Sequence, residues 1–269
     1  MMGDPKFEPI AIIGQGCVLP QASTPEALWE HVCANSILYK DVSAKALGLS
    51  EVARTGRTFV SALIEDGRPS QDDLDPVCRW SLEASTQAWN AARQPTIEPG
   101  RAGIYCANLA YPSRAHAAYA ADIWENGKSS RAPQSVLNAS LPPHLIAREL
   151  KLSGPAYALD AACASSLYAL EIACRRLQSR QIDCALVVGV SAADNLILHI
   201  GFDALHALSP TGRSRPFVAG ADGLVPSEGA VAVVLKRLSD VTLENQVHGI
   251  IRGIGLTNDG CRKGYLAPS

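Results

Sequence analysis

The chain has 269 residues, enough for one large domain or two smaller ones, and its hydrophobic content of 47% can fill a sizeable core. Its 24 basic and 26 acidic residues are spread along the chain without a basic run, which argues against nucleic-acid binding. No window reaches the roughly 18 apolar residues of a membrane span, and the stretch IAII is too short for a signal-peptide core, so we expect a soluble, cytoplasmic protein without membrane contact.

Short apolar runs alternate with amphipathic ones from the N-terminus onward. EPIAIIGQG (8–16) predicts a buried strand. Ser23 or Thr24 is suited to cap a following helix with Pro25 in its first turn. The apolar face of that helix would consist of Leu28, Trp29 and Val32. Residues 40–72 show weak periodicity, so we expect a loop with short elements.

The rest of the chain continues this alternation. Asp75-Pro76 opens a helix that we predict through about Ala92. The remaining predicted elements are a strand at 101–110, a helix at about 140–150, and strands at 155–161, 184–192, 230–238 and 249–256. The run at 184–192 is apolar throughout, as expected for a strand covered on both faces. The last two strands form a pair joined by a short polar connection. Together these elements predict an α/β layered domain with a mixed sheet.

GQGCVL (14–19) follows a predicted strand, as a dinucleotide-binding fingerprint would. The third glycine of that fingerprint is absent because position 19 is Leu, and Pro20 opposes a helix running straight out of the turn. We therefore interpret these glycines as a tight strand-to-loop turn and predict no nucleotide site.

The eight cysteines are scattered, without a CxxC pair or the Cys/His spacing of a zinc site. They are Cys17, Cys33, Cys78, Cys106, Cys163, Cys174, Cys184 and Cys261. In a reducing compartment we expect most of them to be small buried hydrophobic residues. Neither a bound metal nor a disulfide framework is predicted.

Cys163 differs from the others because it lies where an apolar run meets a helix-like run, in LDAACASSLYALEIACRRL (159–177). Small neighbours leave room for a substrate near the sulfur. In the first turn of a helix, a dipole contribution of at most ~2 kcal/mol would lower a thiol pKa of about 8.5 by roughly 1.5. First-turn N–H groups are also suited to bind an acyl-transfer oxyanion. On these residues alone, a buried structural cysteine remains an equal alternative.

No histidine has the acidic or glycine-rich context that would mark it as a base for Cys163. The six histidines are His31, His116, His144, His199, His206 and His248. We expect His31 on the surface of the first helix and the others in structural roles.

Cys163 lies in DAACASSLYAL (160–170), which resembles the active-site segment of the β-ketoacyl synthases, the condensing enzymes of fatty-acid and polyketide assembly. Further segments follow in that family's order: ALSPTGRSRPF (207–217), ADG (221–223), SEGAVAVVLKRLSD (227–240) and IIRGIGLTNDG (250–260). The opening segments IAIIGQGCVLP and TPEALWEHV resemble the family's N-terminus. The likeness spans nearly the whole chain. The sequences DAACASSLYAL and IRGIGLTND are most similar to ketosynthase domains of iterative polyketide synthases.

The resemblance implies a thiolase-like fold of two similar halves, usually paired as a homodimer. Residues 8–240 would be the N-terminal subdomain and 247–269 the beginning of the C-terminal one. Cys163 matches the nucleophile that accepts an acyl group from the phosphopantetheine arm of an acyl carrier protein, with its own backbone N–H as an oxyanion donor. The chain itself would bind no cofactor. A malonyl extender is then decarboxylated, and its carbanion attacks the acyl-enzyme.

For that second step the family uses two histidines and a lysine of its C-terminal half, and this chain ends at 266–269 before they could occur. By this interpretation the missing base belongs to a C-terminal half or a larger synthase. Some residues depart from the family pattern. Residues 216–218 read PFV rather than PFD, and residues 227–231 read SEGAV where the family has a GEGxG-like stretch. Gln21 occupies a position where a glycine is common. Because Val231 is β-branched, the backbone there must avoid positive φ.

Three functions stay open. The first is the nucleophile-bearing half of a ketosynthase, active once joined to a C-terminal half. The second is a truncated or degenerate half that acts only as a dimerising or scaffolding piece, with which the departures are compatible. The third is thiolase-type acyl transfer to coenzyme A, against which the LSPTGR, ADG and LKRL segments argue.

Overall fold

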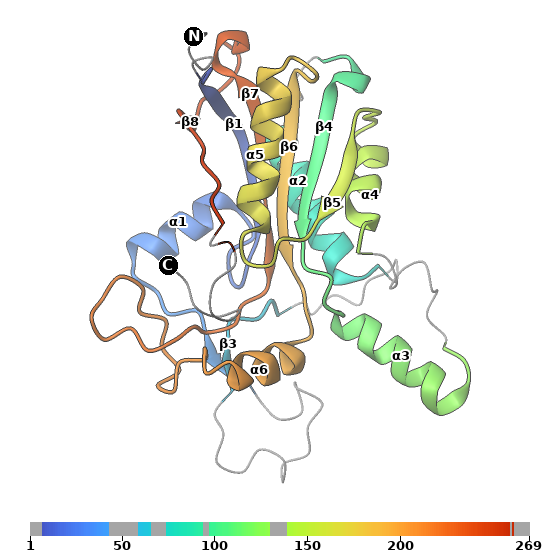
Figure 1. Ribbon diagram of the computed structural model, residues 1–269, viewed down its shortest axis with the longest axis vertical. Helices are drawn as coiled ribbons and strands as arrows, with labels where there is room; N and C mark the ends of the chain where they lie inside the picture. Colours follow the sequence, from blue (N-terminus) through green and yellow to red (C-terminus); the bar gives the residue numbers. More distant parts are fainter. Residues whose placement is uncertain are drawn as a thin grey trace.

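A six-stranded mixed sheet runs through the centre of the protein (Figure 1). The computed structural model describes residues 7–42, 59–65, 74–93, 97–129, 139–258 and 260. The strands are β1 (Ile10–Val18), β4 (Ala102–Asn108), β5 (Ala156–Leu159), β6 (Cys184–Ser191), β7 (Gly229–Arg237) and β8 (Gly249–Ile251). They lie in the order β5-β4-β6-β7-β1-β8; β4 is parallel to β5 and β6, and the other neighbours are antiparallel. The predicted layered α/β domain with a mixed sheet is confirmed.

Helices cover both faces of this sheet (Figure 1). They are α2 (Pro76–Ala91) and α4 (Leu141–Glu149) on one face and α5 (Ser165–Gln178) on the other. In β6, Leu186 and Val188 pack in the apolar cluster of α2 and α4, whereas Ala185 and Val187 pack in the cluster of α5. The prediction that this strand is covered on both faces is therefore confirmed.

The other elements are shorter or lie outside these layers. They are helices α1 (Pro25–Cys33), α3 (Arg114–Asn126) and α6 (Asn195–Ala204), the 3₁₀ helices η3 (Pro99–Arg101) and η5 (Leu238–Asp240), and the small sheet of β2 (Lys40–Asp41) and β3 (Val60–Ser61). Helix α3 extends away from the sheet and buries none of its residues (Figure 1). Among the described helices, none has the length and apolar character needed to cross a membrane.

The two predicted helix starts are confirmed by their capping contacts. Thr24 Oγ1 accepts a hydrogen bond from the backbone N–H three residues on (3.2 Å), and Asp75 Oδ1 accepts one from the N–H two residues on (2.8 Å). A proline follows each cap, where its missing N–H costs nothing. The predicted apolar face of α1 is not covered by the described chain, however: Trp29 is 66% and Val32 is 58% exposed.

Gly14 and Gly16 lie inside β1, so our interpretation of them as a turn is wrong. A Cβ atom would come within 2.2 Å of the carbonyl oxygen of Ala88 at Gly14 and of Ala84 at Gly16. These glycines therefore allow α2 to lie directly against the strand. The chain turns after the strand instead, where Gln21 has a φ of 57°.

The last two strands also differ from the predicted pair. Both form, but β7 and β8 lie on opposite sides of β1 and pair with it rather than with each other. Strand β8 is only three residues long, shorter than the predicted 249–256. The segment expected to begin a second subdomain thus contributes a strand to the same sheet, and residues 261–269 lie outside the described residues.

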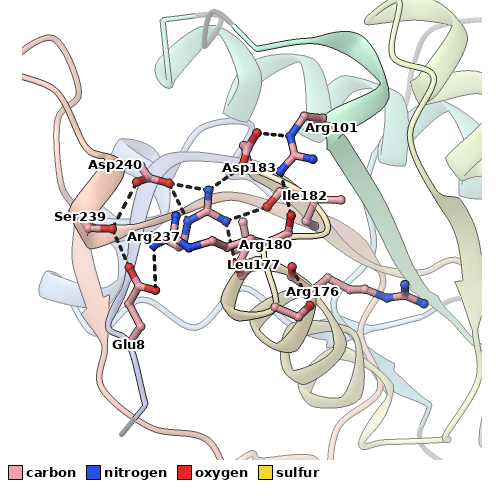
Figure 2. A network of polar contacts seen from close by, with 11 residues as sticks. Glu8, Arg101, Arg176, Leu177, Arg180, Ile182, Asp183, Arg237, Ser239 and Asp240 are labelled. Atoms are coloured by element: carbon pink, nitrogen blue, oxygen red, sulfur yellow. Dashed lines mark hydrogen bonds and ion pairs between the residues drawn. The ribbon is translucent and has the colours of Figure 1, made fainter. Parts of the chain in front are cut away.

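A buried arginine, Arg237, connects three elements where α5 ends and β6 begins (Figure 2). The Arg237 side chain is only 3% exposed, and its Nη1 donates to the carbonyl oxygens of Leu177 (2.7 Å) and Ile182 (2.8 Å). It also forms ion pairs with Asp240 and Asp183. Together with Arg101, it holds the pKa of Asp183 well below its usual range. The network fixes the end of β7 against the end of α5 and the start of β6.

Candidate active site

Cys163 lies in the short connection between β5 and α5. The strand ends at Leu159 and the helix begins at Ser165, with Ala164 as its N-cap. Cys163 therefore precedes the cap, and our placement of it in the first helical turn is corrected by two residues. Its side chain is exposed, as access by a substrate requires.

The backbone turns sharply just before the thiol. Ala162 has a φ of 50°, in the left-handed region that alanine rarely occupies. Its N–H donates to Asp160 Oδ1 at 2.9 Å, and its carbonyl oxygen accepts from Ser165 Oγ at 2.6 Å. Ser165 Oγ also accepts the N–H of Ala161 at 2.8 Å. Two side chains thus hold the backbone on either side of the turn.

Four of the five backbone N–H groups around the thiol already have acceptors. Those of Ala161 and Ala162 donate to side chains, and those of Ala164 and Ser165 donate to the carbonyl oxygens of Ala161 (3.2 Å) and Ala162 (3.1 Å). Within the described part of the chain, the N–H of Cys163 donates to no acceptor. It is the one donor of this turn that is left for a substrate oxygen.

Asp160 connects this turn to a second loop. Its Oδ2 accepts the N–H of Ala110 at 3.0 Å, in the connection between β4 and α3. The two N–H donors, from Ala110 and Ala162, lower the pKa of Asp160. The carboxylate is thereby kept ionised, with both of its oxygens used. Asp160 was not among the residues predicted from the sequence; its signal is the Asx-turn pattern, in which an Asp oxygen bonds the N–H two residues on.

Most of the other cysteines are buried and have raised pKa values, which keep their thiols protonated. Burial raises the pKa to about 11 for Cys17 and Cys174, and to about 12 for Cys78, Cys106 and Cys184. The prediction that they are core residues is confirmed. Cys33 is exposed, like Cys163, and Cys261 lies outside the described residues.

Two histidines have ring contacts with groups other than the thiol. His199 is 2% exposed, with Nδ1 at 2.8 Å from the carbonyl oxygen of Asn195 and its ring edge-on to Phe59. His31 Nε2 lies 3.1 Å from the carbonyl oxygen of Gln21. Among the described residues, no histidine hydrogen-bonds Cys163, and no group of three His, Cys, Asp or Glu side chains could hold a metal ion.

A cavity of about 750 Å³ lies beside α6 and β3. Its walls include Phe59, His199 and Ile200, and Cys163 is not one of its lining residues. The cavity and the exposed thiol are thus separate features of the protein.

The motifs ALSPTGRSRPF (207–217) and ADG (221–223) meet at Asp222. Its carboxylate accepts from Ser209 Oγ (2.8 Å) and Thr211 Oγ1 (2.6 Å), and Arg215 lies 2.9 Å away. These donors lower the pKa of Asp222. Gly223 has a φ of 142°, and a Cβ there would meet backbone atoms of Leu208 and Ser209 at 2.5 Å. The two motifs therefore form one folded loop.

Residues 7–241 match the family model of the beta-ketoacyl synthase N-terminal domain. The chain belongs to the β-ketoacyl synthase family. It is 33% identical to a phenolphthiocerol/phthiocerol polyketide synthase from Mycobacterium bovis, over 97% of this chain and 15% of that protein. It is 30% identical to the pikromycin polyketide synthase component PikAIII from Streptomyces venezuelae, over 97% of this chain and 18% of that protein.

Solved ketosynthases share the fold. The ketosynthase from module 6 of the bacillaene synthase of Bacillus subtilis 168 superposes with a TM-score of 0.76 at 27% identity, covering 97% of this chain and 45% of that one. The PfaC keto synthase-chain length factor reaches a TM-score of 0.78 at 24% identity, over 91% of this chain and 31% of that one. The thiolase-like fold is confirmed, and the chain spans less than half of each ketosynthase structure.

The residues that depart from the family pattern are accommodated locally. Val231 lies within β7 with no positive φ, as its branched side chain requires, and the left-handed position of that stretch is Gly229 (φ 147°). Phe217, in the PFV segment, has a φ of 65° and a fully exposed side chain. Gln21 occupies a positive φ despite its Cβ.

Proposed function

We propose that the chain is the nucleophile-bearing half of a ketosynthase, in which Cys163 accepts an acyl group from the phosphopantetheine arm of an acyl carrier protein. The observation that carries this proposal is the exposed thiol beside its own unused backbone N–H. The sulfur attacks the thioester carbonyl, and the N–H stabilises the oxyanion that forms. Collapse expels the carrier's thiol, which takes up the proton that Cys163 loses.

Condensation is the second half-reaction. A malonyl thioester loses CO₂, its carbanion attacks the acyl group on Cys163, and the Cys163 sulfur leaves as the new carbon–carbon bond forms. We assign proton handling in this step to histidines of a C-terminal ketosynthase half. The length of the related synthases supports a larger assembly, with the chain as part of a homodimer and an acyl carrier protein as its partner.

A non-catalytic dimerising or scaffolding piece is the second candidate. Trp29 on α1 and Leu167 on α5 are 66% and 57% exposed, which suits surfaces that a partner covers. Thiolase-type transfer to coenzyme A is a third candidate of the same fold.

Intact-mass spectrometry after brief exposure to a short acyl thioester, such as hexanoyl-N-acetylcysteamine, tests the proposal. We expect one acyl adduct on the chain and on Cys33→Ala, and none on Cys163→Ala. Cys33 is the matched control because it is the other exposed cysteine of the described chain. No adduct, or equal labelling of both cysteines, favours the scaffolding function. Faster acylation by acyl-coenzyme A than by acyl-carrier protein favours the thiolase-type function.

With acyl- and malonyl-carrier proteins, we expect the isolated chain to be acylated but to yield no β-ketoacyl product. The reason is that the described part of the chain places no histidine in hydrogen-bond contact with Cys163. A β-ketoacyl product from the pure chain would contradict the assignment of the base to another half.

A further inference from the structure

The residue before Cys163 adopts a conformation that its own side chain disfavours. In the left-handed region the Cβ atom of an L-residue crowds the following carbonyl oxygen, so glycine is the usual occupant. Ala162 lies there with a φ of 50°. The conformation persists only if the surroundings hold it. Because the next residue is Cys163, whatever holds Ala162 also sets where the sulfur points.

Both polar groups of the Ala162 backbone are held by side chains. Asp160 Oδ1 accepts its N–H (2.9 Å), and Ser165 Oγ donates to its carbonyl oxygen (2.6 Å). Ser165 is 5% exposed and is the first residue of α5, whereas Asp160 directly follows β5. The turn is therefore fastened to one rigid element on each side.

The orientation of the Asp160 carboxylate is itself set by a separate loop. Its second oxygen accepts the N–H of Ala110 at 3.0 Å. Since both oxygens serve as acceptors, a carboxylate is required. An amide supplies one acceptor oxygen and turns an NH₂ donor toward the other N–H.

We infer that Asp160 and Ser165 are positioning residues, which hold Ala162 left-handed so that the Cys163 sulfur and N–H face an incoming thioester together. This inference rests on the proposed function of Cys163 as the acyl acceptor. It makes a specific prediction about glycine. If the role of Asp160 is to maintain the left-handed turn, glycine at 162, which adopts that turn without strain, restores what is lost when Asp160 is removed.

The test compares acylation of Cys163 by hexanoyl-N-acetylcysteamine in wild type, Asp160→Asn, Asp160→Ala and the double variant Asp160→Ala/Ala162→Gly. We expect Asp160→Ala to be slower by about tenfold or more, because displacements near 1 Å have such effects on reacting groups. Asp160→Asn should lie between it and wild type, and the double variant within about threefold of wild type. Asp122→Ala is the matched control, because its carboxylate accepts from Ser129 Oγ (2.8 Å), far along α3.

A second readout separates this inference from the proposed function. Iodoacetamide should alkylate Cys163 and Cys33, the two exposed cysteines of the described chain. The ratio of the rates at these two sites reports the presentation of the Cys163 thiol independently of acyl transfer. If wild type is not acylated at all, the proposed function fails. The positioning role is still supported if the alkylation ratio is highest in wild type and the double variant, lower in Asp160→Asn and lowest in Asp160→Ala. Wild-type rates in Asp160→Ala, or no restoration by Ala162→Gly, would overturn it. Should Asp160→Ala not fold, Asp160→Asn with and without Ala162→Gly gives the same comparison.

Discussion

At the scale of single residues, Gly14 and Gly16 determine how closely α2 approaches β1. The space that a Cβ atom would need is already occupied by carbonyl oxygens of the helix. Backbone atoms of a packed helix cannot rotate aside as a flexible side chain can. These two positions consequently tolerate no side chain unless the helix moves off the sheet.

Gly16→Ala should therefore lower the free energy of unfolding by about 1–3 kcal/mol, the usual cost of overpacking a core. Gly201→Ala is the control, since nothing lies within 4 Å of a Cβ there and the position is inside α6. Alanine in a helix is favoured over glycine, so this control should be stabilised by about 0.5–1 kcal/mol. Urea unfolding followed by circular dichroism measures both, and equal stabilities would contradict the packing argument.

At the scale of elements, capping residues and one buried arginine decide where helices begin and how they are tied down. Helices α3 and α6 went unpredicted although their caps are visible in the sequence. Ser113 Oγ accepts a backbone N–H at 3.1 Å, and Asp194 Oδ1 accepts two, at 2.9 and 3.2 Å. In the folded protein, α3 buries none of its residues and α6 buries only Asn195 and His199, so neither contributes apolar side chains to the core.

Arg237 connects β7, α5 and β6, and we expect its removal to lower the free energy of unfolding. Arg237→Ala leaves the carbonyl oxygen of Ile182 without the guanidinium donor, removes that donor from the carbonyl oxygen of Leu177, which keeps the N–H of Arg180, and takes one of two arginines from Asp183. We expect a loss of about 2–4 kcal/mol in the free energy of unfolding. Arg176→Ala is the control, because Arg176 lies on the same helix, is exposed, and hydrogen-bonds the side chain of Gln181, which is also exposed. A change within about 0.5 kcal/mol is expected there, and similar losses for both variants would contradict the role of the network.

At the scale of the whole molecule, the described chain leaves large apolar side chains uncovered on several elements. They are Trp29 on α1, Trp124 on α3, Leu167 on α5, Phe217 in the PFV segment and Leu243 after η5. Helix α5 in particular packs one side on the sheet, while Leu167 near its start is exposed. Exposed apolar surface on this scale is typical of faces that another chain or domain covers.

The isolated chain should accordingly self-associate as its concentration rises. Sedimentation velocity over a hundredfold range of concentration measures this, and the weight-average sedimentation coefficient should increase. Leu167→Gln should reduce the effect if the outer side of α5 takes part, because it removes apolar area without touching the core. A monomer throughout that range would contradict the expectation that these faces need a partner.

The sequence by itself determined most of the secondary structure and singled out the cysteine that we propose as the nucleophile. Apolar periodicity and capping act over a few residues, so β1, β6, α1 and α2 could be predicted from short windows. The segment around Cys163 resembles the family's active-site segment in consecutive residues, and it lies within the range that matches the family model.

Only the tertiary structure decided the rest. Strand order depends on contacts between residues far apart in the chain, which is why β8 lies beside β1 rather than β7. The need for a glycine at position 16 is evident only from the close contact of α2 with this residue. The turn before Cys163 also depends on tertiary contacts. Ala162 is left-handed and hydrogen-bonds Asp160 and Ser165, and Asp160 in turn accepts the N–H of Ala110 from a separate loop. Local sequence patterns therefore indicate which residues form the helices, the strands and the candidate active site, whereas long-range packing determines their geometry.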